Sequence, residues 1–364
     1  MRIVVAGGGS GGHITPILAV VRALKSQAKT VDIHYIGLGE RRERELMASS
    51  GVHLHQIKAG KVRRYHNRTR RQRWLDLKTL WFNVRDLVRV GIGLLQSLAL
   101  LIRLRPERIF IKGGYVGVPV GLAAWCLRIP FVIHESDSVP GLANRLLSRL
   151  TPYRISGFPL PGYVNLGNPI RIELLEAASP SRASFGIASD KPVILAVGGS
   201  LGSESLNSCV TRLAEITDRF EIIHITGDNK TAALSRPHYH QYPFLLEEMA
   251  AALQLADVVI ARAGANTLAE LAALRKVSLI VPHPSLSGNH QHQNALALAE
   301  HGAIVLLPQS ELDPQHLADT LERLTSDSGY RTQLQERISA FARADAAERI
   351  ATMVLEPYSA EGEE

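Results

Sequence analysis

The stretch RIVVAGGGSGGH, residues 2–13, decides the fold: a short β-branched apolar run ends in glycines and is followed by a helix-like segment. PVILAVGGSLGSES, residues 192–205, repeats this pattern. A strand, a glycine turn and a helix in this order open a doubly wound α/β domain, so the repetition predicts two such domains in tandem. Further apolar runs alternate with Ala/Leu-rich stretches of helical length, which predicts a parallel sheet in each half.

The connection between the halves is marked by composition. GFPLPGYVNLGNP, residues 157–169, is dense in Gly and Pro, as inter-domain connections are. We therefore expect an N-terminal domain over 1–163 and a C-terminal domain over 164–338. Apolar residues recur at steps of three or four through 332–354, which predicts a final amphipathic helix.

Composition limits the class of protein. The chain has 364 residues, 46% of them hydrophobic, and its two cysteines, Cys126 and Cys209, are too few for a disulfide scaffold or a structural zinc site. The N-terminus shows no signal peptide, which favours the cytosol. The longest nearly apolar run, Val90 to Ile102, falls short of the roughly 20 residues that a membrane span needs.

Charge is divided unevenly between the halves. Residues 1–150 hold 25 Lys+Arg against 9 Asp+Glu, whereas 151–364 hold 16 against 25. This asymmetry indicates that the two halves face different partners.

The first glycine loop suits a phosphate group. Gly7, Gly9 and Gly12 fit the dinucleotide pattern G-x-G-x-x-G, whose backbone N–H groups approach a pyrophosphate. A dehydrogenase would also need an acidic residue at the end of the second strand, but that strand ends in Gly37-Leu38-Gly39, which disfavours NAD binding. The absence of G-x-x-x-x-G-K-[ST] disfavours a P-loop ATPase.

His13 directly follows Gly12, where a helix with Thr15-Pro16 in its first turn should begin. A helix N-terminus favours a neutral imidazole, so His13 is a candidate general base or hydrogen-bond donor. It could equally be a loop histidine that caps its own helix.

The second half has three polar motifs: GGSLG (198–202), RAGANTLAE (262–270) and SGNHQHQN (287–294). Residues 264–267 should form a helix start that binds anions. Glu270, one turn further on, could accept both hydroxyls of a ribose or could simply be a favourable charge near a helix N-terminus. The amides and imidazoles of 287–294 suit sugar hydroxyls, although a hydrophilic loop without function would look similar.

Together these motifs resemble a known family. They occur, with GGYVGVPVGLAAW (113–125), IHES (133–136), GLANRLLS (141–148), GNPIR (167–171) and HITG (224–227), in the order seen in the MurG family. This family comprises the UDP-N-acetylglucosamine:undecaprenyl-diphospho-muramoylpentapeptide N-acetylglucosaminyltransferases of peptidoglycan synthesis. The resemblance implies the GT-B fold, with two Rossmann-like domains, an inter-domain cleft and a C-terminal helix, here 339–358, that packs back on the first domain.

The resemblance also implies a donor site for UDP-GlcNAc. Ser200 and its glycine turn would meet the diphosphate, Leu246 the uracil, Glu270 the ribose and Gln291 the sugar hydroxyls, while Arg171 would suit the leaving group. The full set implied for binding is Ser10, Gly11, Gly12, Asp137, Arg171, Ser200, Leu246, Ala265, Asn266, Thr267, Leu268, Ala269, Glu270 and Gln291. The candidate catalytic residues are His13 and, second to it, Asp137, with Glu135 a further candidate base.

Two motifs depart from the family pattern. Where the family commonly reads His-Glu-Gln-Asn, this chain has His134-Glu135-Ser136-Asp137. At the last position a carboxylate therefore replaces an amide that contacts the sugar of UDP-GlcNAc. Asp137 can still accept a hydrogen bond from a sugar hydroxyl, but it lacks the N–H groups of the amide. His290 replaces the first of a pair of glutamines, and Gln291 keeps the second.

The largest departure is the basic segment 58–73, which carries eight cations and leads into aromatic and aliphatic residues at helical spacing over 74–88. Such a composition suits an anionic membrane, where each cation contributes about 1 kcal/mol. The alternative is that the aromatic residues are core and the arginines are merely solvated.

The expected reaction is an inverting transfer of N-acetylglucosamine from UDP to the C4 hydroxyl of undecaprenyl-diphospho-muramoyl-pentapeptide, at the cytoplasmic face of the plasma membrane. No Asp-x-Asp stands in the donor region, so no metal or other cofactor is expected. Two rivals stay open: a GT-B transferase with another lipid or polysaccharide acceptor, and a nucleic-acid-binding protein. The second would use the 58–73 cations but would leave the donor motifs without purpose.

Overall fold

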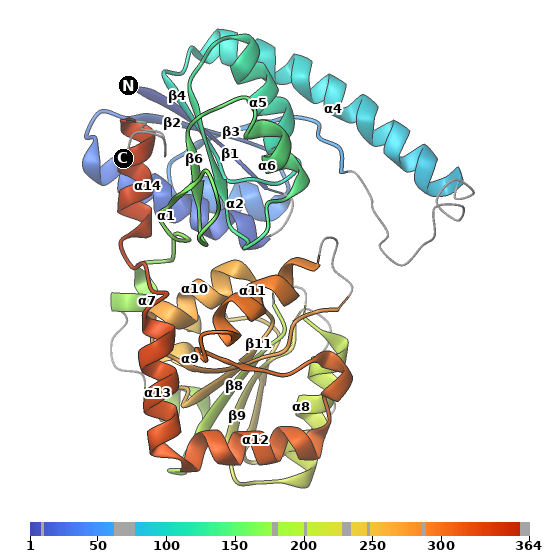
Figure 1. The fold of residues 1–364 in the computed structure, drawn as a ribbon, viewed down its shortest axis with the longest axis vertical. Coiled ribbons are helices and arrows are strands. Elements are labelled where there is room, and N and C mark those ends of the chain that lie inside the picture. The colour runs from blue at the N-terminus through green and yellow to red at the C-terminus, as the bar shows by residue number, and fades with distance from the viewer. Residues whose placement is uncertain are drawn as a thin grey trace. The chain divides into compact units, whose positions relative to one another are not determined.

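The computed structural model describes residues 1–8, 11–61, 77–176, 181–199, 202–227, 234–245, 248–284 and 289–356. The chain forms two compact units, one of residues 1–170 with 344–364 and one of residues 171–343. Each is a parallel sheet with helices on its faces (Figure 1). The expected class, two doubly wound α/β domains, is confirmed.

The first unit has a seven-stranded parallel sheet with the order β3-β2-β1-β4-β5-β6-β7. Helices join its strands from β1 to β6 along the chain, so each of these crossovers lies on a face of the sheet, whereas β7 follows β6 directly. The strands are β1 (Arg2–Ala6), β2 (Asp32–Gly37), β3 (His53–Gln56), β4 (Arg108–Ile111), β5 (Phe131–Glu135), β6 (Arg154–Ser156) and β7 (Val164–Asn165). The helices are α1 (Gly11–Gln27), α2 (Arg41–Ser49), α4 (Leu77–Leu104), α5 (Gly117–Cys126), α6 (Leu142–Leu147) and α14 (Ala346–Leu355).

The second unit repeats the plan with six strands in the order β10-β9-β8-β11-β12-β13. The strands are β8 (Val193–Val197), β9 (Glu221–Ile225), β10 (Tyr239–Tyr242), β11 (Val258–Ala261), β12 (Val277–Ile280) and β13 (Val305–Leu306). The α-helices are α7 (Glu173–Glu176), α8 (Glu204–Ile216), α9 (Met249–Leu255), α10 (Ala265–Ala273), α11 (His290–Ala299), α12 (Pro314–Ser326) and α13 (Ser328–Ser339), and the short 3-10 helices are η1 (Arg182–Phe185) and η3 (Gln309–Glu311).

The junction between the units lies between Ile170 and Arg171 rather than after residue 163. Strand β7 explains the shift, because it pairs with β6 and so extends the first sheet beyond 163. Leu166, directly after β7, is buried in the core of the first unit.

The apolar pattern through 332–354 belongs to two helices and not to a single one. Leu334 on α13 packs in the core of the second unit, whereas Ile350 and Val354 on α14 pack in the core of the first. Helix α14 lies against α1, where the Gln27 side-chain amide donates to the Glu348 carbonyl at 2.9 Å. The apolar periodicity continues from α13 into α14 because each helix buries an apolar face. The face of α13 is buried in the second unit and that of α14 in the first.

Helix α4 is much longer than the 13-residue apolar run that the sequence displays. It packs beside α5, and Figure 1 shows its N-terminal end projecting beyond the first sheet. The stretch Trp81–Leu104 is long and apolar enough to cross a membrane by length and composition alone. Core helices of soluble proteins pass the same test, so this property does not by itself assign a span.

Candidate functional site

Each sheet reverses its strand order beside its first strand. In the first unit the reversal lies between β1 and β4, and in the second between β8 and β11. Open α/β sheets bind ligands outside the carboxyl ends of their strands at such switch points. Gly7 and Gly8, directly after β1, and Gly198 and Gly199, directly after β8, lie at these points.

Two buried side chains, Tyr35 and Glu43, pack against the glycines that follow β1. The Tyr35 hydroxyl donates to the Gly7 carbonyl at 2.8 Å and contacts the Glu43 carboxylate at 3.1 Å. A side chain at Gly8, whose φ is +128°, would collide with that carboxylate. Tyr35 and Glu43 were not expected from the sequence, where they look like ordinary strand and helix residues; Glu43 in fact closes a capping box at the start of α2.

Helix α1 begins at Gly11, so the backbone of Gly11, Gly12 and His13 forms its first turn. The helix starts one or two residues earlier than expected, so Thr15-Pro16 lies in its second turn rather than its first. Because Pro16 has no N–H, the Gly12 carbonyl receives no i→i+4 hydrogen bond from it. Ser10 and the His13 side chain lie outside the part of the chain that the structure describes.

The turn after β5 is organised by Glu135. Its carboxylate accepts hydrogen bonds from the backbone N–H groups of Asp137 and Gly141 and from the Asn144 amide, at 2.8–3.1 Å. Burial raises the pKa of Glu135, and the nearby Asp137 raises it further. A buried carboxylate with three donors is an anchor for its turn, so Glu135 is poorly suited to be a base, whereas Asp137 is partly exposed on the turn that it holds.

In the second unit, α10 begins directly after Gly264 without a side-chain cap. The side chains of Ala265 and Leu268 are buried in the unit, so these residues can offer only backbone groups to a ligand. The backbone N–H groups of Ala265, Asn266 and Thr267 belong to the first turn, where a helix carries partial positive charge. Ala269 continues the same helix in its second turn.

Glu270 and Arg171 form an ion pair, with 3.6 Å between Arg171 Nε and a Glu270 carboxylate oxygen. Burial raises the pKa of Glu270, and the guanidinium of Arg171 counteracts part of that rise. Both side chains are about one-fifth exposed, which leaves them accessible to a ligand. The structure therefore brings together two residues that lie a hundred positions apart in the sequence.

Gln291 lies in the first turn of α11, and its side-chain oxygen accepts a hydrogen bond from the His283 backbone N–H at 2.8 Å. This bond ties α11 to the loop after β12. Because the oxygen is engaged, the NH₂ group is the half of the amide that can best serve a ligand.

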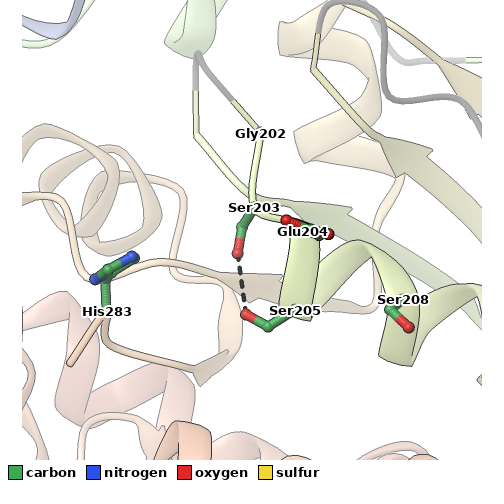
Figure 2. Close-up of a pocket in the computed structure, with 6 residues that line it drawn as sticks. All are labelled: Gly202, Ser203, Glu204, Ser205, Ser208 and His283. Atoms are coloured by element: carbon green, nitrogen blue, oxygen red, sulfur yellow. Dashed lines mark hydrogen bonds between the residues drawn. The ribbon is translucent and has the colours of Figure 1, made fainter. Parts of the chain in front are cut away.

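A cavity of about 580 Å³ lies at the N-terminus of α8 and is lined by Gly202, Ser203, Glu204, Ser205, Ser208 and His283 (Figure 2). Gly202, with a φ of +66°, passes so close to the Thr226 carbonyl that a side chain could not fit. Desolvation lowers the pKa of His283, and the positive charge of Arg262 lowers it further. Ser200 and Leu246, which the sequence implied for the diphosphate and the uracil, lie outside the described residues.

The buried side chain of Arg262 holds two residues of the cavity lining, Ser203 and Ser205. It is 5% exposed and donates to the Val281 carbonyl at 2.9 Å and to the Ser205 hydroxyl at 3.0 Å. Further contacts reach the Ser203 hydroxyl at 2.5 Å and the Gln309 side-chain oxygen at 2.7 Å. The contacts of Arg262 with Ser203 and Ser205 could not be expected from the sequence, because they join residues almost 60 positions apart.

Comparisons with known proteins agree with this layout. Residues 3–152 match the model of the glycosyltransferase family 28 N-terminal domain, and residues 193–350 match that of the family 28 C-terminal domain. A protein of Clostridium kluyveri, named UDP-N-acetylglucosamine--N-acetylmuramyl-(pentapeptide) pyrophosphoryl-undecaprenol N-acetylglucosamine transferase, is 36% identical over 97% of this chain and 98% of its own. A protein of the same name from Lachnoclostridium phytofermentans is 37% identical over 89% and 90% of the two chains. The crystal structure of Acinetobacter baumannii MurG is similar with a TM-score of 0.72, at 26% identity over 98% of this chain and 99% of that one.

Proposed function

Since the chain belongs to glycosyltransferase family 28, with relatives of one name along nearly its whole length, we propose that it transfers N-acetylglucosamine from UDP-GlcNAc to undecaprenyl-diphospho-muramoyl-pentapeptide. The acceptor would be the C4 hydroxyl of the muramoyl sugar, and the product would be the lipid-linked disaccharide of peptidoglycan synthesis. The full-length match to these relatives is the observation that carries the proposal. The layout of the second unit supports it, because an anion-binding helix start and a carboxylate lie together at one sheet edge.

The donor would bind to the second unit. The first-turn N–H groups of α10 would receive the phosphates, Glu270 would accept hydrogen bonds from the ribose hydroxyls, and the NH₂ group of Gln291 would donate to a sugar hydroxyl. When the bond between the anomeric carbon and the phosphate oxygen breaks, negative charge collects on the diphosphate. The helix start and the Arg171 guanidinium would stabilise that charge.

The acceptor would be activated from the first unit. As the C4 oxygen forms its bond to the anomeric carbon, its proton has to leave, and we propose His13 as the base that takes it. The location of His13 in the first turn of α1 supports this role, because a helix N-terminus keeps imidazole neutral and able to accept a proton. UDP departs from the opposite face, so the anomeric configuration inverts. Asp137 would contact the sugar of UDP-GlcNAc. We expect the reaction to need no metal or other cofactor.

The acceptor is a lipid, so we propose that the first unit rests on an anionic membrane at its cytoplasmic face through residues 58–88. Most of the basic part, 62–76, lies outside the described residues. The support comes from α4, whose buried positions Asp86, Ser97 and Leu101 follow one helical stripe. Large apolar side chains are exposed elsewhere along this helix: Trp81, Val84, Leu87, Val88, Leu95 and Ile102. A helix that packs on its own domain and exposes an apolar face fits an interfacial position better than a span.

The reaction is tested by supplying the purified chain with UDP-GlcNAc and a panel of lipid-linked acceptors. We expect product only with the muramoyl-pentapeptide lipid, and efficient use of another acceptor would favour the rival transferase. Retention on anionic vesicles but not on DNA at physiological salt would exclude the nucleic-acid-binding alternative.

The role of His13 is tested with His13→Ala. We expect turnover to fall at least a hundredfold, within the usual range for a general base, while the dissociation constant for UDP-GlcNAc stays within about threefold. Undiminished turnover would contradict the assignment.

A further inference from the structure

Lys112 is a buried cation that the proposed mechanism does not use. It follows β4 directly, at the carboxyl end of the first sheet, and it is 1% exposed. Its ammonium nitrogen Nζ lies 2.9 Å from His134 Nδ1, 2.5 Å from the Ser136 hydroxyl and 3.5 Å from the Asn168 side-chain oxygen. A lysine side chain is almost never fully buried unless it is paired, so this position needs a reason.

The hydrogen bonds show that Lys112 is the donor. His134 Nε2 lies 3.0 Å from the Gly167 carbonyl, which can only accept, so Nε2 carries the imidazole proton. In the neutral ring Nδ1 is then an acceptor and faces Lys112. With the Ser136 and Asn168 oxygens it offers three acceptors to the three N–H groups of an ammonium.

None of these three partners carries a negative charge, so the compensating charge comes from further away. Burial lowers the pKa of Lys112 to about 7, and the carboxylates of Glu135 and Asp137 act in the opposite direction. Both belong to β5 and the turn that follows it. Around Lys112 the neighbouring strands contribute neutral groups, namely Gly7 after β1 and Asn168 after β7.

The two carboxylates are not equivalent. Glu135 is held by Asn144 and by two backbone N–H groups, and its pKa is raised. Asp137 is partly exposed. Its neighbour Ser136 has a short side chain that the Lys112 ammonium contacts directly.

We propose that Lys112 is a positioning residue for the transfer reaction, whose buried ammonium fixes the Ser136–Asp137 turn and balances the charge of the Asp137 carboxylate. Lys112, Ser136 and Asp137 then form one unit, in which a buried cation in contact with the turn offsets the Asp137 carboxylate. This inference rests on the proposed function, since Asp137 matters to catalysis only if the donor sugar meets this turn.

The test is a double-mutant cycle of wild type, Lys112→Gln, Asp137→Asn and the double variant. Glutamine keeps a hydrogen-bond donor near the three acceptors but removes the charge. At a pH below the Lys112 pKa, where the wild-type lysine is charged, we expect kcat/KM for UDP-GlcNAc to fall about tenfold or more in each single variant, because each leaves one charge unbalanced. The double variant should recover to within about threefold of wild type.

A merely structural lysine would give a different result. Losses that multiply in the double variant, or a Lys112→Gln protein as active as wild type, would overturn the proposal. Lys191→Gln is the matched control, because this partly exposed lysine pairs with the exposed Asp218 and should change nothing. Binding of UDP alone should stay unchanged throughout, since the nucleotide belongs to the second unit.

The pH profile gives a second readout. In wild type the alkaline limb of kcat/KM should lie well below the ordinary lysine pKa of 10.5, toward 7, because Lys112 loses its proton there and leaves Asp137 unbalanced. The double variant should lack this limb. A limb that is the same in both proteins would contradict the inference.

Unfolding of the same four proteins separates this inference from the proposed function. If wild type transfers no sugar, the proposed function fails, but a melting temperature of the double variant closer to wild type than that of either single variant would still support the Lys112–Asp137 charge pairing. Additive losses of stability would overturn the pairing, whatever the activity.

Discussion

The two units share one plan, yet the carboxyl ends of their sheets carry opposite chemistry. In the first unit a buried ammonium lies beneath a turn that bears two carboxylates. In the second, the start of α10 is followed by a carboxylate paired with a guanidinium, and Arg262 donates to neutral oxygens around a polar cavity. The strand order fixes where a ligand can bind, and the side chains at that edge decide which ligand it is.

The same contrast explains the charge asymmetry of the chain. The second half is acidic overall, yet its site gathers positive potential from helix starts and arginines, which suits an anionic nucleotide. The first half is basic overall, and its exposed apolar helix face suits a lipid surface. The net charge of each half thus indicates what its outer surface faces, whereas the side chains and helix starts at the sheet edge determine which ligand its site suits.

The largest effect should follow from removing the internal support of the second site. Arg262→Met leaves the buried Val281 carbonyl and the buried Ser203 hydroxyl without their donor, so we expect a loss of about 3 kcal/mol in the free energy of unfolding, together with loss of donor binding. Chemical denaturation measures the first effect and calorimetry the second. The control is Arg219→Met, which breaks an exposed ion pair with Glu322 and should cost less than about 1 kcal/mol; equal losses in the two variants would contradict the role of Arg262.

Glu270→Gln should weaken UDP-GlcNAc binding by about 10- to 100-fold, because hydrogen bonds to a charged acceptor are worth about 1.5–3 kcal/mol. Calorimetric titration measures the change. Glu300→Gln alters an exposed carboxylate just after α11 and should leave the affinity unchanged. If the two variants bind equally well, Glu270 is not the ribose ligand.

The membrane face should belong to the first unit alone. Leu87 on α4 is 71% exposed, and Leu87→Glu should reduce retention on anionic vesicles about tenfold, because an apolar contact is lost and a repelled charge is added. Ile216→Glu makes the same kind of change at the exposed end of α8, and vesicle sedimentation should show no effect. Equal losses at both sites would remove the distinction between the units.

The smallest effect is one of pH. The pKa of Glu270 is raised above 4.5, so donor affinity should begin to fall, as the pH is lowered, at a higher pH than for an ordinary carboxylate. Stability should change in the other direction. The folded state binds the Glu270 proton more tightly than the unfolded chain does. The stabilisation that comes from protonated Glu270 is therefore present at low pH and is lost as pH rises through the folded-state pKa. Titrations of wild type and Glu270→Gln from pH 4 to 7 would show both trends in wild type only; identical curves would contradict the assignment.

Much of the fold could be predicted because its signals are local. The glycine turns after β1 and β8, and the helix that starts after Gly264, follow from residue types over a few positions. The break between α13 and α14 could not be predicted, since the apolar pattern runs on without Gly or Pro and only packing assigns its halves to different units. The helical pattern over 74–88 and the apolar run Val90 to Ile102 were treated as separate segments, whereas α4 joins them, because Arg89 interrupts the apolar pattern without ending the helix.

The candidate site was predictable where a motif carries it and not where tertiary contacts do. Glu270 and the α10 start lie within one short motif, whereas Lys112 looks in sequence like a surface cation after a strand. Its burial depends on His134, Ser136 and Asn168, which come from other segments. Long-range polar contacts of this kind leave no periodic trace in the sequence.

The most direct test of the account is the fate of the sugar in a single turnover. The purified chain would be mixed with excess muramoyl-pentapeptide lipid and UDP-GlcNAc labelled at the anomeric carbon, and the product would be examined by NMR. The account predicts one disaccharide lipid per UDP released, with the new bond at the C4 oxygen and in the β configuration. Release of UDP with free N-acetylglucosamine, or retention of the α configuration, would contradict it.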